Sequence, residues 1–122
     1  MAGSLMTFTE TVIGSVKKIK CAWVSDDGTG AVSGTTTEGY SGRFLGLITD
    51  PGAPAPSDNY TVTISDGDGV DLLLGSATGN RDTANTEFIK EADIAGVAMS
   101  RLTFAVSGAG NSKQGTIYLL IR

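Results

Sequence analysis

The sequence predicts an all-β fold: an antiparallel β-sandwich of about eight strands, with jelly-roll-like or Greek-key connections. Three observations predict it. Short runs alternate apolar and polar residues, which is the period of a strand with one buried face. The 17 glycines and 3 prolines separate these runs, at turn spacings of roughly 8 to 12 residues. Strand-favouring Thr, Val, Ile and aromatic residues are prominent, and long helix-forming blocks are absent.

The length of the chain predicts one domain. A chain of 122 residues is long enough to bury one core without disulfides or metals. We therefore expect residues 1–122 to form a single β-sandwich domain, with residues 1–14 as an N-terminal strand or arm. In chain order, we expect strands at residues 5–13, 16–25, 40–49, 59–65, 70–74, 85–90, 101–107 and 113–122.

The first half of the chain is divided by glycines. Gly14 and Ser15 are expected to form a turn. Residues 31–39 could be a weak edge strand or a long exposed connection. In the strand that follows, Gly42 and Gly46 stand where a bulge or a close neighbouring backbone would leave no room for a side chain.

The second half has clear strands, a loop, a hairpin turn and one segment that could be helical. Residues 50–57 hold all three prolines and predict a stiff, extended surface loop. Residues 66–69 (DGDG) are expected to close a hairpin onto a returning strand at residues 70–74. Residues 91–100 are the one segment expected to make a helical turn, although Gly96 weakens it.

The missing residue types exclude most catalytic chemistry. The chain has no histidine and one cysteine, so the common general base and the Ser-His and Cys-His nucleophile pairs are absent. Cys21 lies on the apolar side of its strand and is expected to be a buried, inert thiol. We predict no enzyme activity, no cofactor and no metal. A small enzyme using only carboxylates such as Glu87 and Asp93 stays the weaker alternative.

The DGDG turn also resembles the start of a calcium loop. The match fails after it, because an EF-hand would need an oxygen ligand at Val70, glycine at Asp71 and glutamate at Ala77. Aspartate and glycine are also the favoured residues of tight turns. A hairpin turn is therefore the better interpretation, with a weak site of another geometry left open.

The charge predicts neither nucleic acid nor membrane as a partner. The formal net charge is −4, which gives no reason to expect affinity for phosphate backbones or anionic membranes. The one basic cluster, Lys17, Lys18 and Lys20, is expected to be the solvated face of a strand. No secretory signal is apparent, so we expect synthesis in a reducing cytoplasm.

The aromatic residues are mostly expected in the core. Trp23 and Tyr60 stand in phase with aliphatic neighbours. Tyr40, flanked by glycine and serine, is expected to be free to contact a partner, and Arg43 lies near glycine turns.

Several longer segments resemble a family of small tailed-bacteriophage structural proteins. The resemblance covers residues 16–122 and is carried by VKKIKCAWVSDDGTG, TDPGAPAPSDNYTVTISDGDGVD, GNRDTANTE and the closing strand after GNSKQGT. It implies a capsid cement or decoration protein, found on the virion surface, that forms a dimer or trimer and clamps the major capsid protein. A tail or neck location, with a carbohydrate-binding sandwich used for adhesion, is the alternative.

A capsid-binding role predicts which residues meet the partner. The stiff proline loop would lose little entropy on docking, and an extended N-terminal arm could add a strand to a neighbouring sheet. The candidate interface residues are Met6, Phe8, Tyr40, Arg43, Pro51, Pro54 and Pro56.

Overall fold

The computed structural model describes residues 5–26, 30–52, 55–57, 60–67, 69, 71–73, 75, 77, 81, 86–90, 97–110 and 112–122. Within these ranges the chain forms strands and no helix. The strands are β1 (Leu5–Ile13), β2 (Val16–Val24), β3 (Val32–Pro51), β4 (Thr61–Ser65), β5 (Glu87–Lys90), β6 (Val97–Ser107) and β7 (Gln114–Ile121). Every strand pairing is antiparallel. The predicted all-β, antiparallel class is confirmed.

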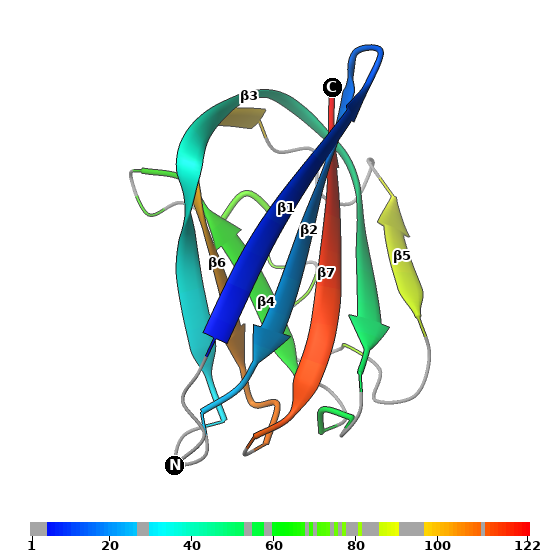
Figure 1. Ribbon diagram of the computed structural model, residues 1–122. Helices are drawn as coiled ribbons and strands as arrows, with labels where there is room; N and C mark the ends of the chain where they lie inside the picture. The colour runs from blue at the N-terminus through cyan, green and yellow to red at the C-terminus, as the bar shows by residue number, and fades with distance from the viewer. Residues whose placement is uncertain are drawn as a thin grey trace.

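One hydrogen-bonded path links six of the strands in the order β1-β2-β7-β3-β6-β4, and β5 pairs with β3 beside it. The long strand β3 makes this possible. Its residues 32–43 pair with β6, and its residues 44–51 pair with β7 and, at 46–49, with β5. Figure 1 shows β3 arching over one end of the molecule between its two arms, so that the sheet curls into a half-barrel.

Glycine allows β3 to bend between its arms. Gly42 has φ +137°, and a Cβ atom there would lie 2.7 Å from the carbonyl oxygen of Arg122. The register against β7 then shifts between Phe44 and Gly46. The prediction of a bulge or close backbone at Gly42 and Gly46 is therefore confirmed.

The structure settles the two interpretations of residues 31–39. From Val32 onward this stretch is the first arm of β3 and is continuous with the strand predicted at 40–49. Threonine hydroxyls support it. The Thr35 and Thr103 hydroxyls lie 2.9 Å apart across the strands, and the buried Thr36 hydroxyl accepts the Leu102 N–H at 3.1 Å where the ladder is irregular. An exposed connection is thus excluded.

The core lies inside the curl. Its largest fully buried side chains are Trp23, Tyr60, Phe44, Phe104, Ile19, Leu47, Ile64, Leu73, Leu102, Ile117 and Leu119. The Trp23 and Tyr60 rings lie 5.7 Å apart, and Phe8 on β1 meets Phe104 edge-on at 5.2 Å. The expectations that Cys21 is a buried thiol and that Trp23 and Tyr60 belong to the core are confirmed.

Two predicted elements are wrong where the structure describes them. Of the strand expected at residues 70–74, the described residues 71–73 form none, because Asp71 makes an isolated bridge to Ser65 and the next two residues turn. The Asp71 carboxylate accepts the N–H groups of Leu73 at 3.1 Å and Gly75 at 3.0 Å, and this local bonding replaces a ladder.

The second error concerns the helical turn at residues 91–100. Residues 97–100 belong to β6 and pair with β3 near its bend, so the strand ladder outweighs a weak local helix preference. Residues 91–96 lie outside the described residues.

Gly115 provides a test of core packing. A Cβ atom at Gly115 would lie 2.5 Å from Cζ2 of the buried Trp23. We expect Gly115→Ala to lower the free energy of unfolding by about 1–3 kcal/mol, because the buried indole would have to shift from its packed position. Urea unfolding measures this. Gly39→Ala is the matched control, since its nearest neighbouring atom would lie at an ordinary 3.6 Å; equal losses in both variants would contradict the packing described.

Candidate interaction surface

An exposed row of side chains crosses four neighbouring strands on the outer face of the sheet. Lys20 on β2 is paired with Tyr118 on β7, Tyr118 with Ile48 on β3, and Ile48 with Phe88 on β5. Because directly paired residues point to the same side of a sheet, these four side chains lie in one line. Phe88 is 59% exposed and Lys20 is exposed, while Tyr118 and Ile48 are half-buried.

A second row extends this surface. Lys18 on β2 is paired with Leu120 on β7, and Leu120 with Gly46 on β3. The Phe88 ring lies over Gly46, since a Cβ atom there would be 2.5 Å from Phe88 Cζ. We call Lys18, Lys20, Ile48, Phe88, Tyr118 and Leu120 the aromatic face. It is apolar toward β5 and basic toward β2.

Lys18 joins the two rows. Its Nζ lies 4.6 Å from the centre of the Tyr118 ring, within the range of a cation–π contact. This contact holds the ring and the ammonium group together at the β2 side of the aromatic face. Lys18 and Tyr118, which come from neighbouring strands, therefore contact each other on the aromatic face.

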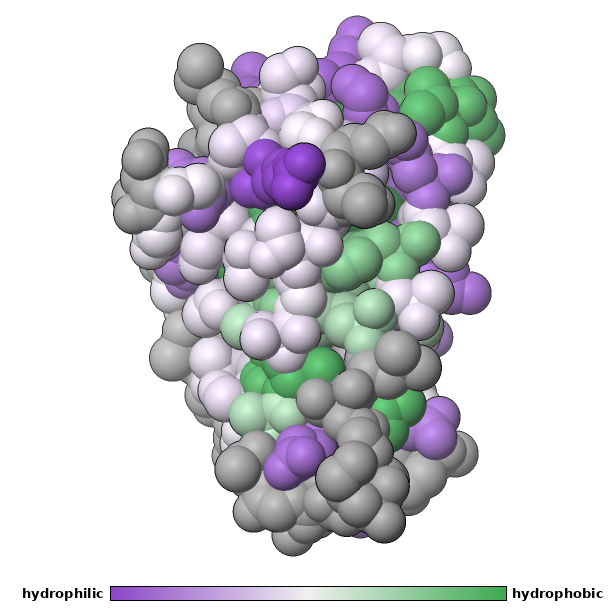
Figure 2. All heavy atoms as spheres, turned by 60° about the vertical axis from the view of Figure 1, so that its left-hand side comes forward, coloured by the Kyte–Doolittle hydropathy of each residue, from purple (hydrophilic) through white to green (hydrophobic). Residues whose placement is uncertain are grey.

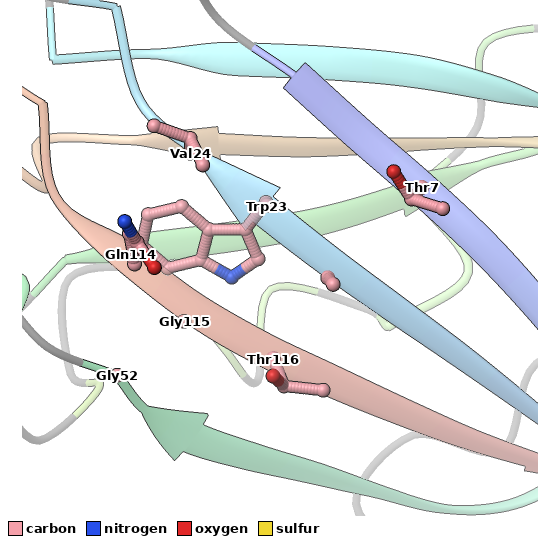
Figure 3. A pocket seen from close by; sticks show the side chains of 8 residues that line it. Thr7, Trp23, Val24, Gly52, Gln114, Gly115 and Thr116 are labelled. Carbon is pink, nitrogen blue, oxygen red and sulfur yellow. The ribbon is translucent and has the colours of Figure 1, made fainter.

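A small hollow of about 170 Å³ lies at one end of the same sheet. Figure 3 shows it between β1, β2, β7 and the end of β3, with Thr7 and Thr116 on its sides and Trp23 against Gly115. The buried indole N–H of Trp23 has no acceptor among the described residues. The lining holds hydroxyl and amide groups and no ionisable side chain. It suits hydrogen bonding to a small group and offers no acid or base.

Among the described residues, the other exposed large apolar side chains lie on the N-terminal hairpin. Val12 is 54% and Ile13 is 77% exposed, next to the turn between β1 and β2. Figure 2 shows an apolar cluster at the upper end of the molecule, where this hairpin ends. We call Val12 and Ile13 the hairpin tip.

The predicted interface residues are placed on several strands. Met6 and Phe8 are half-buried and are brought together over Gly34, where a Cβ atom would lie 3.2 Å from Met6 and 3.3 Å from Phe8. Pro51 is half-buried at the end of β3, and Pro56 is buried. Pro54 lies outside the described residues. Of the described members, the structure therefore brings Met6 and Phe8 together.

Tyr40 and Arg43 both lie on the first arm of β3. The expectation that Tyr40 is free is wrong, because its side chain belongs to the core cluster and is only 9% exposed. Alternation in β3 turns it inward although its neighbours in the sequence are small. Arg43 is exposed, and its backbone exchanges hydrogen bonds of 2.9 and 3.0 Å with Arg122.

A buried arginine anchors the loop region between β4 and β5. Arg81 is 6% exposed, with its Nη1 3.4 Å from the Thr49 hydroxyl and 3.5 Å from a Glu87 carboxylate oxygen. Its backbone N–H donates to the Tyr60 carbonyl at 3.1 Å. A guanidinium paired in this way ties three parts of the chain together and serves the fold.

Two buried acids predict how stability depends on pH. Burial raises the pKa of Cys21 from 9.0 to about 12 and that of Tyr60 from 10.0 to about 12, with the Thr49 hydroxyl and Arg81 opposing the shift at Tyr60. Both groups hold their protons more tightly in the folded protein than in the unfolded chain. Their stabilisation is therefore complete below pH 9.0 and is lost as the pH rises toward about 12.

We expect the midpoint of urea unfolding to fall steadily between about pH 9 and about pH 12. Tyr60→Phe and Cys21→Ala should each reduce that slope, whatever they do to stability at neutral pH. An unchanged slope in both variants would show that neither proton is responsible.

Within the described residues, no group of three His, Cys, Asp or Glu side chains is arranged to hold a metal ion. Glu87 is half-exposed beside Arg81, whereas Glu91, Asp93 and Asp68 of the DGDG turn lie outside the described residues. No helix in the described part is long and apolar enough to cross a membrane. Comparison with protein-family models, curated proteins and solved structures found no match.

Proposed function

We propose that this chain is a virion structural protein that binds and stabilises the assembled capsid of a tailed phage, through its aromatic face. The observation that carries the proposal is the exposed row Lys20–Tyr118–Ile48–Phe88 across four strands. The segments that resemble small phage structural proteins support the same role. In this proposal the chain is not an enzyme and uses no cofactor.

The aromatic face has the chemistry of a protein-binding surface. Exposed aromatic side chains and their apolar neighbours supply most of the energy at protein interfaces. They stand here on a hydrogen-bonded sheet, so little conformational entropy is lost when a partner covers them. Lys18 and Lys20 at one side would orient an acidic patch of the partner and speed its association.

The proposed partner is the major capsid protein in its assembled form. A protein that binds the lattice but not free subunits stabilises the lattice by mass action. Assembly of the protein as a dimer or trimer would let each oligomer bind several capsid subunits at high effective concentration. We further propose that the curled sheet is a variant of the jelly-roll sandwich, with each arm of β3 in one layer, and that the protein is located on the capsid surface.

Co-sedimentation with capsids tests this function. Purified protein is added to expanded shells of the major capsid protein encoded by the same genome. Stoichiometric binding and a higher temperature of shell disruption are expected. Absence of binding at micromolar concentration would reject the proposal.

One observation favours a second function. Phe88 exposes its aromatic ring on the outer face of the sheet, beside the half-buried Tyr118, an arrangement on which the apolar face of a sugar can stack. A carbohydrate-binding domain of a phage tail or neck would use the same surface. Calorimetric titration with glycans separates the two functions: heat of binding with free sugars, together with no binding to capsid shells, would favour adhesion.

A further inference from the structure

Strand β1 has an unpaired edge next to the hairpin tip. Among the described residues its only strand partner is β2. Side chains 9–13 are exposed on both faces of the strand, including the apolar Val12 and Ile13. A straight, exposed edge of this kind is a template for pairing with another strand.

The hairpin fixes which backbone groups face outward. Gly14 and Ser15 form a two-residue turn closed by the pair Ile13 and Val16. In an antiparallel ladder, alternate residues direct both N–H and C=O toward the partner strand. Counting back from Ile13, residues 13, 11 and 9 face β2, so Glu10 and Val12 present their backbone groups to the open side.

We propose that this edge binds the same edge of a second copy of the chain, antiparallel and about a two-fold axis through Thr11. Glu10 then lies opposite the partner's Val12, and each pair exchanges two backbone hydrogen bonds. Thr11 lies opposite the partner's Thr11. The two exposed hairpin tips are covered in one contact.

Charge complementarity selects this register. Glu10 and Lys17 have no ion-pair partner among the described residues. Within one chain Lys17 is paired with Val12 on the same face of the hairpin. In the dimer Glu10 therefore lies in the same row as the partner's Val12 and the partner's Lys17. Its carboxylate can reach that ammonium group across the smaller valine, and symmetry gives the pair twice.

The neighbouring registers are less favourable. An axis through Glu10 would place two carboxylates directly opposite each other, which is destabilising. An axis through Thr9 would need the edge at Met6 and Phe8, where β1 already packs over Gly34 of β3. The axis through Thr11 uses only the segment that is exposed on both faces.

This inference deepens the proposed function and rests on its oligomeric part, because it supplies the surface through which copies of the protein assemble. The dimer contact lies at the hairpin edge. The aromatic face lies over β2, β7, β3 and β5, so a capsid could bind it independently.

Cysteine cross-linking tests the register. The two Thr11 positions form a non-hydrogen-bonded pair with Cα atoms about 4.5 Å apart, within disulfide range. Thr11→Cys is expected to give a covalent dimer on mild oxidation with diamide, and Thr9→Cys is not. The native Cys21 is buried and should not contribute. Efficient cross-linking of Thr9→Cys instead, or of neither variant, would overturn the proposed register.

A charge swap tests the ion pairs. Sedimentation equilibrium of the unmodified protein should show a concentration-dependent dimer. Glu10→Lys should weaken dimerisation at least tenfold, and adding Lys17→Glu to it should restore the dimer. Monomers at every concentration, or no rescue in the double variant, would reject the inference. Capsid co-sedimentation of Glu10→Lys distinguishes the two proposals, since a failed dimer with retained capsid binding leaves the proposed function standing.

Discussion

Replacing Phe104 with alanine is expected to lower the free energy of unfolding by about 3–5 kcal/mol, whereas the same change at Phe88 should alter it by less than about 0.5 kcal/mol. Phe104 is fully buried and meets Phe8 edge-on, while Phe88 is 59% exposed. Truncation of the buried ring removes its burial energy and leaves a cavity. Urea unfolding of the two variants measures the difference.

The pair of phenylalanines is a matched control, because the chemical change is identical and only the environment differs. Thermal unfolding should rank the two variants in the same order. A loss at Phe88 as large as that at Phe104 would mean that the Phe88 ring is buried in the protein in solution, and the aromatic face would no longer be an exposed surface.

Phe88→Ala is expected to weaken binding to capsid shells by about 30-fold or more, which corresponds to the 2 kcal/mol of an interface hot spot. The reason is that Phe88 has the most exposed ring of the aromatic face. Its ring lies over Gly46, which has no side chain to separate the ring from the sheet. Quantitative co-sedimentation with shells measures the change. Lys20→Glu should slow association more at low than at high salt.

Arg101→Ala is the control for that experiment, since Arg101 is exposed on β6, a strand outside the aromatic face. It should bind shells like the unmodified protein. If Phe88→Ala binds normally while Arg101→Ala fails, the capsid contact lies on the β6 side of the sheet and the assignment of the aromatic face is wrong.

The sequence contains a sign of the aromatic face, which is the presence of adjacent apolar residues where simple alternation would place one apolar and one polar residue. Leu47–Ile48, Phe88–Ile89 and Leu119–Leu120 are pairs of adjacent apolar residues. Neighbours in a strand point to opposite faces, so one member of each pair must face outward. Leu47, Ile89 and Leu119 are buried, and Ile48, Phe88 and Leu120 form part of the outer surface. That the three outward residues meet depends on strand order, which the sequence does not reveal.

The strands with regular alternation could be predicted closely, because local sequence decides which face is buried. The first arm of β3 could not, since its glycines and threonines resemble a loop until β6 supplies a ladder for them. The prediction of a returning strand at residues 70–74 was wrong for the opposite reason. Its leucines are apolar enough for a strand, but the Asp71 side chain satisfies the nearby amides and turns the chain.

The interface residues expected on the proline loop and the N-terminal arm stay a prediction. In the structure, these residues differ in how far their side chains are buried within the molecule. Tyr40 lies in the core cluster, and Met6 and Phe8 are half-buried against it. Their exchange for a partner would cost the internal contacts they now make. Phe88 of the aromatic face and the two residues of the hairpin tip are exposed before binding and have no such cost, which makes them the better candidates.

The continuity of β3 has a consequence for how the molecule comes apart. A single strand contributes backbone to the ladders of both β6 and β7. The strands on the β6 side and those on the β7 side cannot separate as independent units, because separation would break the hydrogen bonds of β3 to one of the two. Loss of structure at either end should therefore spread through this shared span, and the whole polypeptide should melt in one step.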